Sequence, residues 1–481
     1  MTTTATPTTP RTGLWTVLGF LVGVKIASGI LQGYYTPIFS DIARHLSIRD
    51  ADVNWFEAAQ LVVSALVVPL LARLGDLVGH RNVLLLSTAV TALASWAVAF
   101  SPGFWTFLVA WALQGFYVVW LPLEVSIIHR RTAGTGQQSV LTRRAAAFLV
   151  AALELGVIVG ALSSGALVDD GGLTMTTVLM IPAVAVSLCF LVVWFGVAAT
   201  PAAGRGRVDW AGFGLVTLAI ALVMGGLILV RIQGPASLAA WGLIVLGLLA
   251  FVPFVRLELR TDEPLIDVRL LATPGQWPVQ LTAFLFGMSV LGAQIPLSTF
   301  ARTDPAVVGY GLGASASFVS TLIGVYVVTL VAGALLLPVV ARALGTRGAM
   351  IAASLLVAVG YALFLPFHGS TLHALLNMAV AGVGSGALVA ALPAAAAAAA
   401  PADRTGFVTG MTNTTKTIGG AIASSVFAIA LATTGSLDDG SVAGHAPLAG
   451  YLAVWSVCAV TALVAAAALL VVPKDAFADR A

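Results

Sequence analysis

Five ionisable side chains interrupt long apolar runs in this sequence, and they are the residues best suited to chemistry. They are Lys25, Glu57, Glu124, Glu154 and Lys416. A charge at the centre of a hydrocarbon layer costs about 2.5–3.5 kcal/mol or more, so such a residue needs a partner and usually serves binding or proton transfer. A lysine–carboxylate pair can also act as a proton switch, because protonating the carboxylate breaks the pair.

Two of these charges are expected to pair. Glu154 follows Arg143 by eleven residues, which at about 1.5 Å per residue places it roughly 16 Å deep, near a bilayer midplane. Lys25 lies one helical turn from Ser28 on the same face. We expect Lys25 and Glu154 to pair and Glu154 to take part in coupling; a purely structural pair, or a lysine that snorkels to the interface, is the alternative.

The other three charges have simpler expectations. Glu57 begins an apolar run, so we expect it near the outer surface, and Glu124 lies close to His129 and the arginines that follow. Exposure or a local salt bridge would explain both. Lys416, with Asn413 one turn away, either holds an anionic or carbonyl group or reaches the inner interface.

Polar and aromatic residues within the apolar runs are candidates to face an internal cavity. They are Gln32, Tyr34, Tyr35, Gln60, Trp111, Trp120, Gln294 and Asn377. A largely apolar pocket with a few polar groups suits an amphiphilic organic molecule. The alternative is interfacial or lipid-facing packing, which is common for Trp and Tyr in membrane proteins.

A charged stretch, LGDLVGHRNV, separates two apolar runs. Asp76 can meet Arg81 and nearby helix N-termini there, while Gly75 and Gly79 allow backbones to approach closely. We predict a latch that joins two helix bundles and releases when they separate. A solvated turn is the alternative.

The elements that must position these residues are membrane-spanning helices. The chain has 481 residues, of which 59% are hydrophobic and 9% charged, with a mean hydropathy of +1.02. A soluble protein needs a more polar surface, so the sequence indicates an all-α integral membrane protein. Cys189 and Cys458 lie within apolar runs and are expected to be unpaired.

A bilayer core of about 30 Å needs roughly 20 apolar helical residues. That window predicts fourteen transmembrane helices, at 14–38, 54–74, 82–100, 103–127, 145–168, 173–197, 210–231, 238–256, 276–300, 314–340, 348–366, 371–395, 405–432 and 448–472. Pro122 is expected to kink the fourth. The Thr/Pro-rich start, residues 1–13, is predicted to be a disordered tail rather than a removable signal peptide.

Basic residues orient the chain. With the N-terminus inside, most of the 23 Lys and Arg residues fall on cytoplasmic segments, and the other face holds Arg44, Arg49, Arg231 and Arg302. The positive-inside rule therefore predicts cytoplasmic N- and C-termini in a plasma (inner) membrane. The net charge of +3 reflects this topology and implies no nucleic-acid partner.

The spans divide into six, two and six. We predict an N-terminal six-helix bundle at 14–198, two inserted helices and a cytoplasmic linker at 199–275, a C-terminal six-helix bundle at 276–472 and a C-terminal tail at 473–481. Two six-helix halves around a central path suit rocking about a midplane site.

The sequence argues against several classes of function. The six histidines are scattered without carboxylates or motifs around them, so we expect no enzyme, no metal site and no cofactor. No phosphate-binding Gly-x-x-x-x-Gly-Lys-Ser/Thr loop occurs, which excludes self-contained ATP drive.

The stretch ARLGDLVGHR resembles the loop signature of the major facilitator superfamily, Gly-x-Leu-Ala/Gly-Asp-basic-x-Gly-basic-basic. The positions that match are Leu74, Gly75, Asp76, Gly79 and Arg81. Ala72 replaces the first Gly, while Leu77 and His80 stand where basic residues are usual. The resemblance implies the major facilitator fold and a gating role for this loop.

Other stretches are similar to the fourteen-helix drug/proton antiporter branch of that family. RLELRTDEPLIDVRLL resembles the segment before its ninth span, and the residues after Leu392 resemble its span 12–13 connection through Pro393, Gly406, Gly410, Asn413, Lys416, Gly419 and Gly420. The span-5 glycines Gly156, Gly160 and Gly165 resemble the antiporter signature, although Ala161 replaces its Pro. Their four-residue spacing favours close helix packing.

The branch carries proton-handling groups on spans 1 and 4, and this chain departs from both. An Asp is usual at Ser28 and an Arg at Trp111. The resemblance implies a monomeric secondary transporter that exports a drug-like or metabolite amphiphile in exchange for protons. The two replacements keep open facilitated diffusion, or a non-transporting receptor or assembly protein. The excess of Arg over Lys, with abundant Ala and Gly, is typical of a high-GC bacterial genome.

Overall fold

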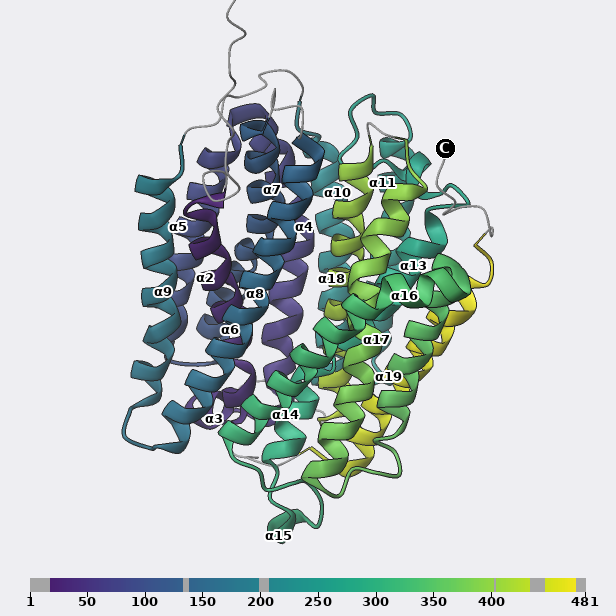
Figure 1. Cartoon of the computed structure of the whole chain (residues 1–481). Helices are drawn as coiled ribbons and strands as arrows, with labels where there is room; N and C mark the ends of the chain where they lie inside the picture. Colours follow the sequence, from purple (N-terminus) through teal and green to yellow (C-terminus); the bar gives the residue numbers. More distant parts are fainter. Residues whose placement is uncertain (1–17, 133–137, 199–206, 402–403, 433–445, 473–481) are drawn as a thin grey trace, which may run out of the picture.

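The computed structural model describes residues 18–132, 138–198, 207–401, 404–432 and 446–472, and within them every regular element is a helix. The predicted tails at 1–13 and 473–481 lie outside the described residues. The helices run side by side along one long axis (Figure 1). An all-helical membrane fold is therefore confirmed.

The first part of the chain forms what we call the N-terminal bundle. Its helices are α2 (Leu21–Tyr34), η1 (Thr36–Ile38), α3 (Phe39–His45), η2 (Asp50–Val53), α4 (Asn54–Val78), α5 (His80–Ala99), α6 (Phe104–Gln114), η3 (Gly115–Val119), α7 (Trp120–Arg131), α8 (Gln138–Asp169) and α9 (Met175–Gly196).

A helix pair and then a second group of helices follow. The α10–α11 pair spans Trp210–Gln233 and Leu238–Glu258, and the short α12 is Val268–Leu271. The C-terminal bundle consists of α13 (Trp277–Val290), α14 (Gln294–Arg302), α15 (Pro305–Val308), α16 (Ala316–Ala362), α17 (Thr371–Ala398), α18 (Thr405–Ala430) and α19 (Leu448–Leu469).

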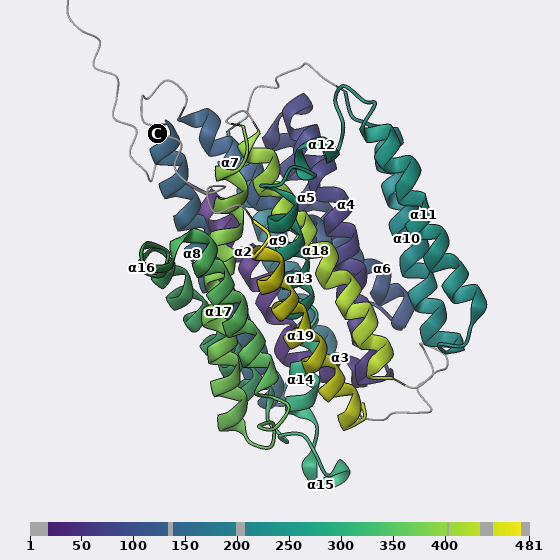
Figure 2. The same ribbon diagram turned by 90° about the vertical axis from the view of Figure 1, so that its right-hand side faces the viewer.

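The molecule has two distinct ends along the helix axes. The short α12 lies at one end, with the C-terminal part of α7, and α3, α14 and α15 lie at the other (Figures 1 and 2). We call these the α12 end and the α15 end. Asp76, near the last turn of α4, belongs to the α12 end, because α4 begins beside η2 and α3 at the α15 end.

Two large hydrophobic cores underlie the bundles. One is built almost entirely from residues of α2–α9 and contains Trp120 and Phe107. The other is built almost entirely from the C-terminal bundle, with Ala51 of η2, and contains Trp455 and Phe364. Each bundle therefore has its own apolar interior, which lets the two pack as separate units. The predicted domain limits themselves stay a prediction.

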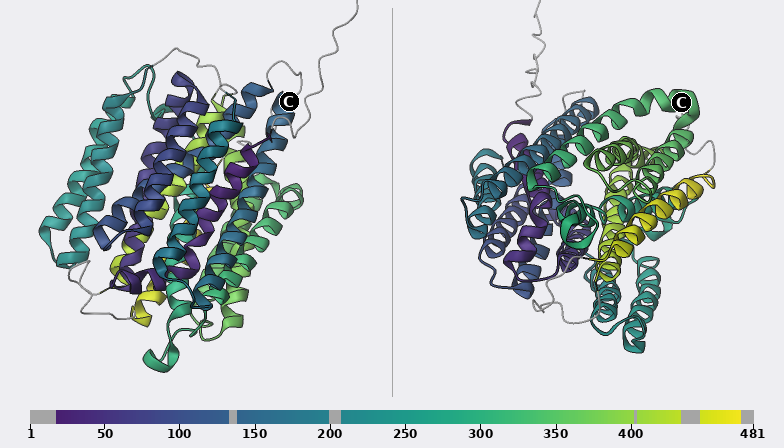
Figure 3. Two further views of the ribbon diagram at one scale, coloured as in Figure 1. Left: turned by 90° about the vertical axis from the view of Figure 1, so that its left-hand side faces the viewer. Right: turned by 90° about the horizontal axis from the view of Figure 1, so that it is seen from below.

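The α10–α11 pair stands at the edge of the molecule, against the two bundles (Figure 3). Its inner face packs Val216, Ile220 and Phe254 against Val62 and Leu66 of α4. At the α15 end, Arg231 of α10 donates two hydrogen bonds to the carboxylate of Asp52, at 3.1 and 3.0 Å, and both side chains are buried. This bidentate pair fixes the inserted helices to the N-terminal bundle.

Several predicted spans are broken helices. The fourth changes to a 3-10 helix at Gly115–Val119, before the kink expected at Pro122. Gly115 explains the position, because a Cβ atom there would lie 2.6 Å from the Gln60 carbonyl oxygen of α4. Only glycine lets the two backbones meet this closely.

The predicted spans 314–340 and 348–366 both fall in α16, which has one break. Gly345 has φ 73° and ψ 163°, a backbone conformation open essentially to glycine alone, and it separates two helical arms. The stretch that corresponds to LGDLVGHRNV in the second half is therefore a turn between two helices.

Among the described residues, eleven helices are long and apolar enough to cross a membrane. The predicted spans at 14–38 and 405–432 are not among these eleven, and α16 accounts for two predicted spans at once. The chain is thus a multi-pass membrane protein, while the count of fourteen stays a prediction.

Candidate functional site

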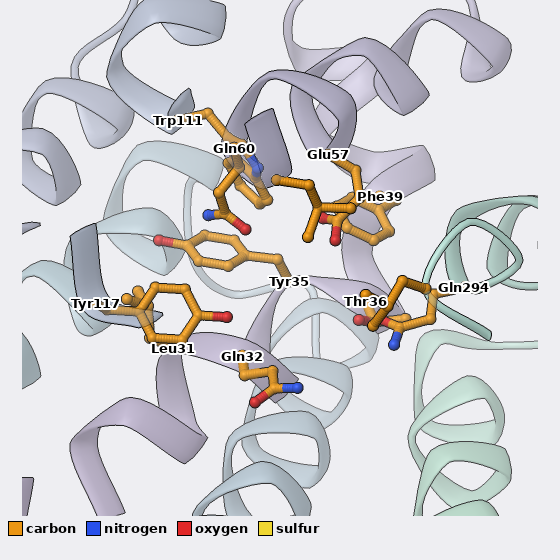
Figure 4. A pocket seen from close by; sticks show the side chains of 12 residues that line it. Leu31, Gln32, Tyr35, Thr36, Phe39, Glu57, Gln60, Trp111, Tyr117 and Gln294 are labelled. Carbon is orange, nitrogen blue, oxygen red and sulfur yellow. The ribbon is translucent and has the colours of Figure 1, made fainter. Parts of the chain in front are cut away.

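A narrow cavity of about 50 Å³ lies between the two bundles, towards the α15 end (Figure 4). Gln294 and Leu291 contribute from the C-terminal bundle, and the N-terminal bundle supplies Leu31, Gln32, Tyr35, Thr36, Phe39, Glu57, Gln60, Leu61, Trp111 and Tyr117. Five of the eight predicted cavity residues line it, namely Gln32, Tyr35, Gln60, Trp111 and Gln294. Its volume in this conformation suits one or two water molecules.

The remaining three predicted cavity residues are used elsewhere. The hydroxyl of Tyr34 donates to the carbonyl of Val178, and the amide of Asn377 donates to the carbonyl of Phe367. Trp120 is completely buried in the core of the N-terminal bundle. These side chains stabilise helix packing.

Aromatic rings form one wall of the cavity. Trp111 packs against Tyr35 with ring centroids 4.4 Å apart, and Phe39 and Phe56 surround it. Its indole N–H is buried and has no hydrogen-bond partner among the described residues. The hydroxyl of Tyr35 accepts a hydrogen bond from Gln114, whose amide also donates to Ser95. The wall is thus held rigidly from behind.

Glu57 lies near the expected end of its span but is not exposed, and no salt bridge to it is found among the described residues. It is half-buried in the first turn of α4 and lines the cavity, with Tyr117 near enough to feel its charge. Among the described residues it has no ion-pair partner within 4.0 Å. A carboxylate is therefore directed at the space between the bundles.

Lys25 pairs with Glu124, so the predicted pairing with Glu154 is wrong. Nζ of Lys25 on α2 lies 3.5 Å from Oε2 of Glu124 on α7, and their exposed fractions are 2% and 0%. Neither carboxylate oxygen has a hydrogen-bond partner in the described part of the chain. Glu124 was expected to pair with His129 or the arginines that follow it in the sequence. Its partner is instead Lys25 of α2, because α2 packs against α7.

The charge of Glu154 in the N-terminal bundle interacts with that of Lys416 in the C-terminal bundle. Glu154 lies on α8 and Lys416 on α18, both are half-buried, and their charges interact. Neither has an ion-pair partner within 4.0 Å among the described residues. Asn413 is half-buried one turn before Lys416, and its carbonyl accepts from Thr417. Ser28 is buried beside Lys25 on α2.

Asp76 has partners different from the one expected. Its carboxylate lies 3.1 Å from Nη2 of Arg130 on α7 and 3.4 Å from Nε2 of His80. Arg81 donates to the carbonyls of Trp194 and Val197 at the end of α9. Arg130 and His80 both belong to the N-terminal bundle, so in this conformation these contacts do not join the two bundles.

The conformation at Gly79 explains this arrangement. Gly79 has φ 94°, which turns the chain sharply between α4 and α5. A Cβ atom on Gly75 would lie 3.0 Å from the side chain of Leu123 on α7. The glycines thus bring α4 close to α7, where Arg130 reaches Asp76.

The bundles are joined by charge at the α15 end. Arg302 of α14 donates to both carboxylate oxygens of Asp41 on α3, at 3.0 and 3.2 Å, and lies 3.8 Å from Asp169 at the end of α8. Arg44 also contacts Asp41. Burial outweighs both arginines and raises the pKa of Asp41 above its usual value.

Hydrogen bonds reinforce that junction. Asp169 accepts from the backbone N–H groups of Ala316 and Ser317, at the start of α16, at 3.1 and 2.8 Å. Ser298 donates to the carbonyl of Thr36 at 2.5 Å, and Ser320 donates to that of Ala161 at 2.6 Å. This set of contacts holds the two bundles together at the α15 end.

The span-5 glycines lie at helix crossings. Cβ atoms on Gly156 and Gly160 would meet the backbone of α2, at 2.4 Å from the carbonyl oxygen of Ile26 and 2.8 Å from that of Ile30. A Cβ on Gly165 would meet Ser320 of the other bundle at 2.2 Å. Only small residues permit these contacts.

Sequence reasoning missed the residues of the α15-end junction. Asp41, Asp169 and Arg302 lie at the ends of helices, where charges are ordinary in a membrane protein. A usable signal was present, because Arg302 is one of only four basic residues predicted on that face. A rare basic residue near a helix end invites a search for a carboxylate partner.

Comparison with known proteins identifies the family of this chain. The family model described as the Major Facilitator Superfamily matches residues 21–424. The chain is 23% identical over 315 residues to a uridine/deoxyuridine transporter of Lactococcus lactis subsp. cremoris (strain MG1363), covering 63% of each chain. It is 27% identical over 270 residues to the tetracenomycin C resistance and export protein of Streptomyces glaucescens, covering 54% of this chain and 48% of that one.

A third relative and two solved structures complete the comparison. The multidrug transporter protein MdtP of Bacillus subtilis (strain 168) is 23% identical over 376 residues, 76% of this chain and 66% of its own. An auto-inhibited POT family peptide transporter superposes with a TM-score of 0.65 at 16% identity, covering 97% of each chain. The nucleoside transporter NupG gives 0.60 at 15% identity, covering 94% of this chain and 98% of that one.

Proposed function

Because this chain belongs to the Major Facilitator Superfamily, whose members move small molecules across membranes, we propose that it exports an amphiphilic organic compound by alternating access. The observation that carries the proposal is the cavity shared by the two bundles, which are joined at the α15 end by the ion pairs of Arg302 with Asp41 and Asp169. Aromatic rings and amides on its wall suit a molecule with a flat apolar part and a polar part.

The path is expected to open at the other end. Gln32 is exposed and Glu154 and Lys416 are half-buried, although all three lie within helices that span the molecule. We propose that water reaches these side chains from the α12 end, because ion pairs and hydrogen bonds hold the two bundles together at the α15 end. The positive-inside rule favours the α12 end as the cytoplasmic one. On this basis the conformation accepts substrate from the cytoplasm, in a protein with fourteen membrane passes and both termini inside.

We propose that proton influx drives export through Glu124. Protonating this carboxylate would leave Lys25 as a buried, unpaired cation, a state costly enough to require rearrangement of α2 against α7. The pair uses the same two helices as the family's usual groups, with the signs of charge reversed. Asp76 keeps its proposed role as a latch, which would reach the C-terminal bundle only when the α12 end closes.

Facilitated diffusion is the second candidate, and the replacement of the usual proton-handling residues by Ser28 and Trp111 favours it. Both are buried, at 2% exposure, and neither carries a charge. Under this alternative the Lys25–Glu124 pair is purely structural.

Reconstituted vesicles separate the possibilities. The full chain would be tested with three fluorescent amphiphiles of different charge, ethidium, rhodamine B and fluorescein, with and without an imposed pH gradient. Export predicts movement of at least one dye that accelerates when the gradient is applied. Dye movement at the same rate with and without the gradient supports facilitated diffusion. No movement of any dye under either condition contradicts transport.

A matched pair of variants tests the coupling residue. Glu124→Gln is expected to keep movement and lose its dependence on the gradient, whereas Glu263→Gln, which removes an exposed carboxylate that does not line the cavity, should behave as the unaltered protein. Gradient dependence that persists in Glu124→Gln would contradict the role of Glu124.

A further inference from the structure

Two carboxyl groups meet where the α10–α11 pair begins and ends. Asp209 immediately precedes α10, and Glu258 is the last residue of α11. A Cβ atom placed on Gly212 would lie 2.4 Å from Oδ2 of Asp209 and 2.4 Å from Oε1 of Glu258, so the two oxygens converge beside the same glycine. The side chains are within hydrogen-bonding reach of each other.

The other oxygen of each carboxyl group is already used. Oδ1 of Asp209 accepts from the backbone N–H of Gly212 at 2.8 Å, and Oε2 of Glu258 accepts from that of Ile266 at 3.2 Å. The facing oxygens, Oδ2 and Oε1, are buried and have no hydrogen-bond donor among the described residues. Glu258 as a whole is only 3% exposed. Two unsatisfied acceptors therefore face each other.

No basic side chain neutralises either carboxyl group. Within the described part of the chain, neither has an ion-pair partner within 4.0 Å. The charged residues of the adjoining elements are Arg207, Arg256, Arg260, Asp262 and Arg269, which are exposed, and the ion pairs Arg73–Glu263 and Arg404–Asp267.

One proton would satisfy both oxygens, because it turns one carboxyl group into a donor for the other. Without that proton, two negative charges repel each other in a buried place. A metal ion fits less well, since Ca²⁺ and Mg²⁺ take six or more oxygen ligands. No group of three or more His, Cys, Asp or Glu residues that could hold a metal ion occurs among the residues that the structure describes.

The pair anchors the chain between α11 and α12, residues 259–267, which we call the strap. The strap leads to α12 at the α12 end of the molecule (Figure 2). Glu258 holds it through the N–H of Ile266, whose side chain packs against the apolar core of α10 and α11. The position of the strap therefore depends on where the Glu258 carboxyl group lies.

The strap also contacts both bundles. Glu263 pairs with Arg73 of α4 at 2.7 Å, and Asp267 lies 3.8 Å from Arg404, which immediately precedes α18. A change in how the strap is held is thus felt by the N-terminal and the C-terminal bundle at the same end of the molecule.

We propose that Asp209 and Glu258 form a proton-binding site, in which one shared proton clasps the strap to the α10–α11 pair and loss of that proton releases it. Two buried carboxyl groups hold a shared proton more tightly than an isolated group does, so the proton is bound at neutral pH and lost as the pH rises. The repulsion that follows drives Glu258 away from Gly212 and breaks its hydrogen bond to Ile266. The inference goes beyond transport and does not depend on what the protein moves.

Amide variants imitate the protonated state. In Glu258→Gln and in Asp209→Asn, the amide group supplies the donor that the shared proton otherwise provides, so both should keep the strap attached at every pH. Asp262→Asn, which removes an exposed carboxylate of the strap, is the matched control. Gly212→Ala should detach the strap at every pH, because its Cβ would take the place where the two oxygens meet.

Hydrogen exchange of the strap amides in the purified full chain measures attachment. Each variant is compared with the unaltered protein at the same pH, so that the intrinsic pH dependence of exchange cancels. At about pH 6, the unaltered protein and both amide variants should exchange equally. At about pH 9, the unaltered protein and Asp262→Asn should exchange about tenfold faster than the amide variants, since one charge-assisted contact is lost.

Infrared spectra detect the proton itself. At about pH 7, the unaltered protein should show a C=O band of a protonated carboxyl group that is missing from Glu258→Gln and from Asp209→Asn, and this band should disappear at about pH 9. Asp262→Asn should keep the band. Either amide variant suffices for the comparison if the other fails to fold.

Three results would overturn the shared proton. They are equal exchange in the unaltered protein and the amide variants at about pH 9, the absence of the infrared band, and a dependence on metal ions. The last would appear as slower exchange of the unaltered protein, but not of the amide variants, when sodium or calcium chloride replaces choline chloride at equal ionic strength. None of these results bears on the proposed export, which is measured separately by dye movement.

Discussion

Lys25 and Glu124 form an ion pair, 3.5 Å from Nζ to Oε2, inside the N-terminal bundle, and water reaches almost none of either side chain. Cys189 of α9 lies close enough to feel both charges. A pair so deeply buried is costly to break from one side, because removing one partner leaves the other charge alone in an apolar core.

Replacing Lys25 alone is therefore expected to destabilise the protein. Lys25→Met should cost about 3–5 kcal/mol of unfolding free energy, since it strands the Glu124 carboxylate. The double variant Lys25→Met with Glu124→Leu should recover most of the loss. Thermal unfolding in detergent measures both, and a single variant as stable as the unaltered protein would disprove the pair's contribution.

Arg302 is expected to hold the α15 end shut. Arg302→Gln removes the contacts to Asp41 and Asp169, so a cysteine placed at Ser298 should react several-fold faster with a membrane-impermeant maleimide. The background carries Cys189→Ala and Cys458→Ala, which remove the two native thiols.

The matched control for that labelling is Arg269→Gln, which removes an exposed arginine of α12 at the opposite end of the molecule. It should leave the labelling rate at residue 298 unchanged. Equal rates in the Arg302→Gln and unaltered backgrounds would show that Arg302 does not maintain closure.

Gly33 is expected to tolerate no side chain. A Cβ atom there would lie 2.2 Å from the carbonyl oxygen of Val157 on α8, so Gly33→Ala must push α2 and α8 apart and should cost about 1–3 kcal/mol. Gly214→Ala on α10 is the control, because a Cβ there meets nothing within 4 Å. Gly214→Ala should be neutral or should stabilise the protein by up to about 1 kcal/mol. Equal effects of the two substitutions would contradict close packing of α2 against α8 at Gly33.

Glu263 is expected to make stability depend on pH. Its carboxylate accepts from the backbone N–H of Arg207 at 2.8 Å and from Arg73 at 2.7 Å, and these contacts hold its pKa below the usual value. A lowered folded-state pKa adds stability above the unfolded pKa of about 4.3, and that stability is lost as the pH falls through the folded-state pKa.

Unfolding temperatures between pH 7 and pH 3.5 measure this effect. The unaltered protein should lose slightly more stability on acidification than Glu263→Gln does, by an amount that salt reduces because the group is exposed. Identical pH profiles for the two proteins would mean that the contacts of Glu263 contribute nothing.

The sequence predicted the helical membrane architecture because apolar runs are a direct consequence of the bilayer. It located the cavity wall well, since polar residues such as Gln32, Gln60 and Gln294 have few other uses in a hydrocarbon layer. Small-residue spacing likewise pointed to the crossing of α2 and α8, where Gly156 and Gly160 lie.

Partner choice could not be predicted, because depth along a span says nothing of rotation about the helix axis or of which helix is adjacent. Lys25 and Glu154 were placed at a similar depth, yet α7 presents Glu124 to Lys25, while the charge of Glu154 interacts with Lys416 of the other bundle. The pairing of Asp76 with Arg130 also depends on which helices are adjacent, since α4 and α7 pack closely at Gly75. Helix-end charges such as Asp41 and Arg302 were hidden because their pairing depends on how the two bundles tilt.

Cross-linking of Thr36→Cys to Ser298→Cys tests the central claim most directly, because these positions face each other across the two bundles. In a chain lacking Cys189 and Cys458, a short bismaleimide is expected to join them readily and to stop dye movement in vesicles, while either single cysteine variant treated alike keeps transporting. Dye movement that continues at full rate in the cross-linked protein would contradict opening and closing of the α15 end as the basis of transport.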